Sequence, residues 1–408
     1  MIKRSVVGKR FCWTIFFVFI YVLGSKISLP FVDLSKALNV NESTATGLEL
    51  TSAVTGGNLR GMSIFSTGLS PWMSSMILWR MFTVSKRFNL EKTSTEIVER
   101  RKMYLALALA IVQALAISIY LPLQTNLDSL FVVTINTMIM IAGTFFLVWL
   151  SDLNSLFGVG GSLVILMSSM VASMPQNILN SIKELQVGPL FVGLLLIISL
   201  AFLYISVIMQ RARYRILVNK ITIHNRFKRY SYLDIQLNPA GGMPFMYAMS
   251  LVSIPQYFLM LLQVIFPNAS WIQDWIGRFA IGRPVWLYTY IVVLFILGLA
   301  FSFINMNGEE IAEKMKKSGE YIYNIYPGEE TSRYINWLIL RFAVIGSTYT
   351  VLMAGLPMLI VLYDPRYMQL TMLPGLFFIF NGMVFNIKEE IDALTLNENY
   401  RPLLEIDS

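Results

Sequence analysis

The sequence predicts an all-α integral membrane protein with ten transmembrane helices. Of its 408 residues, 56% are hydrophobic and only 14% are charged, and the mean hydropathy is +0.61. Apolar stretches recur along the whole chain and alternate with short basic segments. This composition is typical of proteins that span the membrane many times rather than of soluble ones.

Ten apolar segments have the length and composition expected of helices in a bilayer whose hydrocarbon core is about 30 Å thick. The second, fifth and tenth are short, and short helices interrupted by glycine or proline are typical of transport paths. The segments cover residues 11–29, 71–84, 103–121, 130–150, 161–174, 190–209, 242–266, 286–304, 337–362 and 370–385.

The rarity of reactive side chains argues against an enzyme. The first apolar segment follows a basic start and has no small-residue cleavage site after it, so we expect a retained first helix. One cysteine, Cys12, and one histidine, His224, exclude intramolecular disulfides, cysteine metal sites and histidine-based triads. We therefore expect no catalytic site, metal or cofactor. The net charge of +8 lies between apolar segments, so we expect no nucleic-acid binding.

Basic residues predict the orientation of the chain. Roughly 23 Lys and Arg residues fall on the side of the N-terminus and roughly 7 on the other side, which places both termini in the cytoplasm. Two of the cytoplasmic loops, residues 210–237 and 307–334, are longer than a turn between helices requires. Their charges fit two interpretations: attraction to anionic lipids with retention of topology, or a docking surface for another protein.

A glycine-broken, half-polar segment at residues 55–77 leads directly into the second apolar stretch. Irregular backbone at membrane depth is tolerated only where protein buries it or where it lines a water-filled cavity. The segment therefore predicts a pore or a substrate pathway.

Two other classes of membrane protein remain open on composition alone. A small-molecule carrier or lipid flippase would also have broken helices around a central cavity, and a scaffold or insertase would need no pore. The apolar segments hold no paired acidic residues of the kind that ion-coupled carriers use. The glycine-broken segment disfavours the scaffold. No phosphate-binding loop of the Walker type occurs, so ATP energy would have to come from a partner.

Four blocks of sequence resemble the SecY/Sec61 family of protein-conducting channels, in order along the chain. They are Gly-Gly-Asn-Leu at 56–59 with Ser-Ile-Phe at 63–65 and Gly-Leu-Ser-Pro at 68–71; Ala-Gly-Thr-Phe-Phe-Leu-Val-Trp-Leu at 142–150 with Gly-Val-Gly-Gly at 158–161; Gln-Arg-Ala-Arg-Tyr-Arg-Ile at 210–216; and Asn-Pro-Ala-Gly-Gly-Met-Pro at 238–244.

The resemblance implies two inverted five-helix halves, residues 1–188 and 189–408, around an hourglass pore with a plug and a lateral gate. It implies a plug at about residues 46–60, including Gly56, Gly57, Asn58, Leu59 and Arg60. Ser162 falls at one position of the apolar pore ring and breaks its pattern. The remaining ring positions are Leu69, Met73, Leu166, Met246 and Ile379, and the implied polar contacts of the gate are Ser75, Gln113 and Asn238.

The resemblance also implies partners. They are a separate SecA-type ATPase, small Sec subunits or accessory Sec proteins, membrane lipids and a secreted preprotein. The implied motor-binding residues are Arg211, Arg213, Arg215, Lys316, Lys317 and Tyr326.

One departure from the family pattern points to a subfamily. The family usually has arginine where this chain has Tyr326, which predicts a variant motor. In this respect the chain is similar to accessory SecY proteins of Gram-positive bacteria, which export large serine-rich-repeat glycoproteins. The alternative that the resemblance leaves open is a housekeeping SecY, the channel of general secretion. We therefore expect a multi-pass protein of the bacterial cell membrane.

Overall fold

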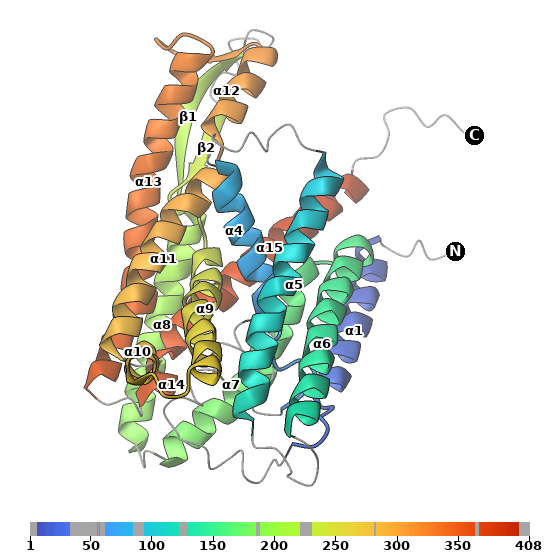
Figure 1. Cartoon of the computed structure of the whole chain (residues 1–408). Helices are drawn as coiled ribbons and strands as arrows, with labels where there is room; N and C mark the ends of the chain where they lie inside the picture. The colour runs from blue at the N-terminus through green and yellow to red at the C-terminus, as the bar shows by residue number, and fades with distance from the viewer. Residues whose placement is uncertain are drawn as a thin grey trace.

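The computed structural model is a tall bundle of helices with a small sheet at one end (Figure 1). It describes residues 6–32, 55, 57, 62–84, 94–121, 129–184, 188–220, 231–280, 283–363 and 367–399.

The helices in the first half of the chain cover the first five apolar segments. Helix α5 contacts both α4 and α6, and α1 contacts α6 and α7. Their bounds are α1 (Val6–Ser25), α4 (Ser70–Val84), α5 (Thr95–Tyr120), α6 (Ser129–Phe157) and α7 (Gly161–Glu184).

The second half of the chain adds longer helices and several short ones. Proline within the first turn starts α8, α9 and α11, because proline lacks the N–H that would be unpaired there. The elements are α8 (Pro189–Arg211), α9 (Met243–Ile265), α10 (Ser270–Phe279), α11 (Pro284–Asn305), α12 (Gly308–Lys317), α13 (Glu329–Gly355), the 3-10 helix η4 (Pro357–Leu362), α14 (Met368–Thr371) and α15 (Leu373–Asn399).

Each of the ten predicted apolar segments falls on a helix. Seven helices in the described part of the chain are long and apolar enough to cross a membrane. The other three segments lie on α4, α7 and α15, the ones that the sequence predicts to be short. This agrees with the predicted class of α-helical membrane channel.

A three-stranded antiparallel sheet is the part of the fold that the sequence interpretation missed. It joins β1 (Arg213–Lys220), β2 (Tyr232–Gln236) and β3 (Glu320–Ile322) in the order β2-β1-β3. Both long loops therefore contribute strands, with Arg215 opposite Asp234 and Asn219 opposite Tyr321. The sheet and α12 share an apolar cluster with α13, which includes Ile216, Met315 and Ile339.

The main apolar core lies where the two halves of the chain meet. It joins buried side chains of α1, α4, α6 and α7 with those of α9, α11 and α15. A second cluster packs α5, α6 and α9 around Met140 and Tyr257. The candidate site lies within the first of these clusters.

Candidate functional site

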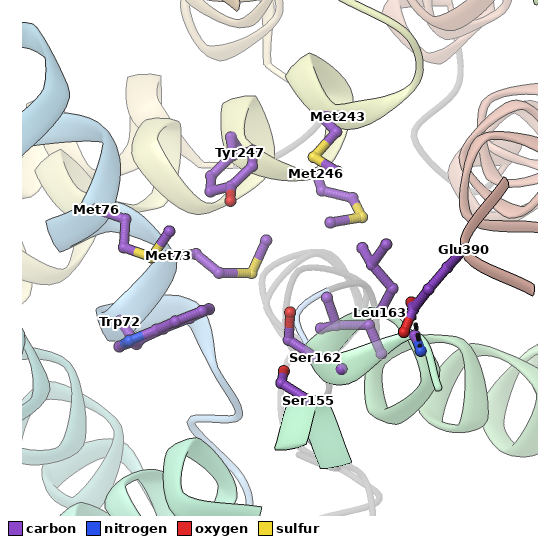
Figure 2. A pocket seen from close by; sticks show the side chains of 13 residues that line it. Trp72, Met73, Met76, Ser155, Ser162, Leu163, Met243, Met246, Tyr247 and Glu390 are labelled. Carbon is purple, nitrogen blue, oxygen red and sulfur yellow. Dashed lines mark hydrogen bonds between the residues drawn. The ribbon is translucent and has the colours of Figure 1, made fainter. Parts of the chain in front are cut away.

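A cavity of about 330 Å³ opens between the two halves of the chain (Figure 2). Helices α4, α7 and α9 form most of its wall, with contributions from the end of α6 and from α15. Its lining residues are Trp72, Met73, Met76, Ser155, Gly160, Gly161, Ser162, Leu163, Leu166, Met243, Met246, Tyr247 and Glu390.

The cavity wall has an apolar side and a mixed side, on which Leu163 lies beside the polar residues (Figure 2). Four methionines from α4 and α9 gather on the apolar side together with Trp72 and Tyr247, whereas Ser155, Ser162 and Glu390 lie on the other (Figure 2). Unbranched thioether side chains adapt to irregular shapes, so this lining can pack against different side chains without a fixed geometry. The wall therefore suits side chains of varying shape better than one small ligand.

The structure brings the five predicted ring residues into one buried apolar cluster. Leu69, Met73, Leu166, Met246 and Ile379 all belong to it, and each is at most 2% exposed. Three of them, Met73, Leu166 and Met246, also line the cavity, as does Ser162 at the position that breaks the pattern. The cavity thus ends on these apolar residues.

Two described residues of the predicted plug region accept hydrogen bonds, one from the residue before α4 and one from α7. The Leu69 amide donates to the Thr55 carbonyl at 2.7 Å, and the Ser169 hydroxyl donates to the Gly57 carbonyl at 3.2 Å. Gly68 has φ of +60°, and a Cβ there would lie 2.7 Å from the Thr55 oxygen. Only glycine allows this approach of two backbones. The other named plug residues, Gly56, Asn58, Leu59 and Arg60, lie outside the described residues.

Three serine hydroxyls connect α4 with α9, and the sequence interpretation did not single them out. Ser250 Oγ lies 2.8 Å from Ser70 Oγ and 2.6 Å from Ser74 Oγ, and it also reaches the Ser70 carbonyl at 2.9 Å. All three residues are buried. Near the C-terminal end of α9, the Tyr120 hydroxyl of α5 donates to Gln263 Oε1 at 2.7 Å.

The three predicted gate residues are buried, but within the described part of the chain their side chains form no hydrogen bond between α4 or α5 and α9. The Ser75 hydroxyl donates to the Trp72 carbonyl of its own helix. Gln113 Nε2 and Asn238 Oδ1 are buried atoms without a hydrogen-bond partner among the described residues. A role for these residues in gating stays a prediction.

A network of hydrogen bonds shapes the mouth of the cavity at the turn between α6 and α7. Glu390 Oε2 of α15 accepts from the Gly160 amide at 2.9 Å (Figure 2). Asn154 Nδ2 donates to the Val159 carbonyl at 3.1 Å, and the Thr14 hydroxyl of α1 accepts from the Val159 amide at 2.9 Å. Gly160 has φ of +79°, which glycine adopts without strain.

The predicted motor-binding arginines are partly used inside the chain. Arg213 pairs with Glu389 of α15 at 3.4 Å and with Asp234 at 3.9 Å, and Arg215 pairs with Asp234 at 3.4 Å. Arg211 lies 5.8 Å from the Phe385 ring centroid.

The remaining predicted motor-binding residues lie on the surface near the sheet. Lys317 pairs with Glu313 at 2.7 Å on α12, and this ion pair lowers the pKa of the Glu313 carboxyl. Lys316 is exposed on the same helix, and Tyr326 is 78% exposed in the turn before α13. Within the described part of the chain, no group of three or more His, Cys, Asp or Glu side chains could hold a metal ion.

A family model for SecY matches residues 63–383, which is more than half of the chain. The chain belongs to the SecY family. The match includes the start of α4, the sheet and every lining residue of the cavity except Glu390, and it confirms the resemblance found in the sequence motifs.

Curated SecY-family relatives match almost the whole length of the chain. The accessory Sec system protein translocase subunit SecY2 of Streptococcus salivarius is 58% identical over 99% of both chains. The protein of the same name from Streptococcus sanguinis is 55% identical over 98% of this chain and 99% of its own.

Solved structures of SecY-family channels share this fold at low sequence identity. A structure described as a protein-conducting channel has a TM-score of 0.68 at 14% identity and covers 100% of this chain and 96% of its own. Sec61 from a canine ribosome–channel complex of the endoplasmic reticulum has a TM-score of 0.64 at 13% identity, with the same coverage. Both support the fold of a protein-conducting channel.

Proposed function

We propose that this chain is the channel subunit of an accessory Sec translocase, which passes unfolded preproteins across the bacterial cell membrane. The high identity to relatives named SecY2 subunits of accessory Sec systems supports the accessory assignment. The resemblance to accessory channels supports large serine-rich-repeat glycoproteins as the exported class. A separate SecA-type ATPase would drive transport, so the chain itself carries no catalytic step.

One observation carries the channel assignment: the predicted ring residues are buried together and border a methionine-rich cavity. An apolar constriction excludes ions by dewetting and needs no fixed charge to do so. Met73 and Met246 make the ring adaptable, because thioether side chains repack around different guests. A polypeptide would therefore pass while the ring closes around it.

The proposed cycle assigns roles to the two halves, the plug and the gate. Residues 1–188 and 189–408 would separate along the contact between α4 and α9, where a signal-peptide helix would replace the serine hydrogen bonds. The Thr55 and Gly57 contacts would break as the plug leaves the ring. Polar contacts between membrane helices average about 0.6 kcal/mol, so these exchanges cost little.

Both termini and the sheet would face the cytoplasm in this proposal, with the motor docked on the sheet and α12. Lys316 and Tyr326 are the best docking candidates, because the described structure gives Lys316 no ion pair and leaves the Tyr326 side chain exposed. Arg213 is a weaker candidate, since it already holds β1 against α15.

The docking assignment can be tested by charge reversal. Lys316→Glu combined with Tyr326→Ala should reduce ATPase binding and export at least several-fold, measured with membrane vesicles and purified motor. Arg100→Glu, at the exposed start of α5, is the control. Unchanged motor binding in the double variant would remove α12 and the following turn from the docking surface.

Site-specific crosslinking from the ring tests the channel itself. A photoreactive residue at Met73 or Ile379 should form adducts with a preprotein stalled during translocation, because both positions border its path. The same residue at Phe258, which is exposed on the outer face of α9, should not. Adducts at neither ring position, with an intact stalled intermediate, would contradict the channel and favour a small-molecule carrier.

A further inference from the structure

Helix α10 has an apolar surface that the folded chain only partly covers. It follows α9 after a short turn and contacts both α9 and α11, at the end of the bundle away from the sheet (Figure 1). Ile272 is fully buried against the protein, whereas Trp271 and Trp275 are 58% and 44% exposed. Two partly exposed tryptophan side chains on one short helix indicate contact with either a partner protein or lipid.

The order of residues divides α10 into three faces. At 100° per residue, Ile272, Ile276 and Phe279 share the face that packs on the protein. Ser270, Gln273, Asp274 and Arg278 share a polar face, and Gln273, Asp274 and Arg278 are exposed. Trp271 and Trp275 lie between these two faces, so they point sideways from the helix rather than toward the protein or directly away from it.

The height of α10 coincides with a membrane boundary. Helix α9 has 23 residues, and a rise of about 1.5 Å per residue makes it roughly 35 Å long, slightly more than the hydrocarbon core. Helix α10 begins just after its end, and α11 starts the return crossing at Pro284. Tryptophan is enriched at exactly this level, because its ring suits the acyl boundary and its N–H suits the headgroups.

The ends of α9 and α11 that flank α10 also expose apolar side chains. Next to α10, the end of α9 exposes Val264, Ile265 and Phe266, and the start of α11 exposes Tyr288 and Val292. These side chains lie on or directly beside helices that are long and apolar enough to span a membrane, so lipid is the solvent that suits them. The Arg278 Cζ atom lies 5.8 Å from the Trp275 ring centroid, which places a cation beside the ring.

From this geometry we infer that α10 is an interfacial anchor, whose Trp271 and Trp275 insert into the boundary between headgroups and acyl chains. The occupant of this surface is the lipid bilayer and not a protein. Because α10 packs directly on α9, the anchor holds the C-terminal end of α9 in place. Helix α9 also carries Ser250 and Gln263. Interfacial helices bind through buried apolar area and attraction between basic side chains and anionic headgroups.

Collisional quenching on the full chain in lipid nanodiscs tests this inference. A Cys12→Ser background removes the single cysteine, and an environment-sensitive fluorophore is then attached at Trp275→Cys or, as the matched control, at Gln273→Cys. Nanodiscs contain either plain lipid or lipid with a nitroxide near the top of the acyl chain. Iodide in the buffer reports exposure to water.

The anchor predicts opposite results at the two positions. The probe at 275 should be quenched strongly by the lipid nitroxide and several-fold less by iodide than the probe at 273. Strong iodide quenching at 275 without nitroxide quenching would overturn the anchor and indicate a water-exposed face for a protein partner. A probe at 275 that neither agent reaches would also overturn it, because the position would then be buried within the protein. Both labelled variants retain the tryptophan at 271, which limits the disturbance of the helix.

Discussion

Two contacts between membrane helices use different chemistry. Helices α11 and α13 meet at Gly298, where an added Cβ would lie 3.2 Å from the Ser347 Cα. Helices α4 and α9 meet through the hydroxyls of Ser70, Ser74 and Ser250. The close packing of α11 on α13 leaves no room for another helix between them. The hydrogen bonds between α4 and α9 can instead be replaced by those of another polar group. The comparison predicts that the contact between α11 and α13 stays closed and that the contact between α4 and α9 can open.

The largest expected effect is at the close-packed contact between α11 and α13. Gly298→Val should lower the free energy of unfolding by about 1–3 kcal/mol, because the new side chain overpacks against Ser347. Thermal unfolding in detergent measures it. Gly193→Val on α8 is the control, since a Cβ there meets nothing within 4 Å. Equal stability of the two variants would show that α11 and α13 can move apart freely.

An intermediate effect is expected at the hydroxyl contact. Ser250→Ala removes hydrogen bonds to two serines and should cost about 1 kcal/mol, with a higher ion leak through the resting channel. Conductance of planar bilayers measures the leak. Ser253→Ala is the matched control, because among the described residues that buried hydroxyl bonds only the Met249 carbonyl of its own helix. An equal leak from both variants would refute a special role for the α4–α9 contact.

The smallest expected effect is at the exposed hydrogen bond between Tyr120 of α5 and Gln263 of α9. Tyr120→Phe removes the bond to Gln263 and should cost less than about 0.6 kcal/mol, since water competes for both groups. Hydrogen exchange at the last turn of α9 should become faster. Tyr288→Phe on α11 is the control: the Tyr288 hydroxyl is exposed and bonds no described residue, so exchange at the last turn of α9 should not change. Slower exchange in Tyr120→Phe would contradict this interpretation.

Sequence reasoning located the helices well because membrane helices carry their signal locally. It missed the sheet, although the alternation of Ile216 and Val218 in β1 is a strand signal. That signal lies within a basic loop, and β1 pairs with β3 from a distant loop, a pairing that no local pattern reveals. Short strands in extramembrane loops were therefore the least predictable part of the fold.

Choosing among similar polar residues also exceeded what the sequence could provide. Ser74 and Ser75 are neighbours of the same type, yet Ser74 bonds across to α9 and Ser75 bonds within α4. Ser70 and Ser74 are four residues apart and share a helix face, whereas Ser75 lies about 100° away. Only the rotation of α4 against α9 decides which serine faces the neighbour, and packing sets that rotation.

The bond between Glu390 and the Gly160 amide has a consequence for biosynthesis. The two residues are 230 positions apart in the chain. Gly160 is synthesised early, at the turn between α6 and α7, whereas its carboxylate partner lies in α15 and is synthesised much later. This contact at the cavity wall thus cannot form until α15 has been synthesised and has reached helices that were made long before it.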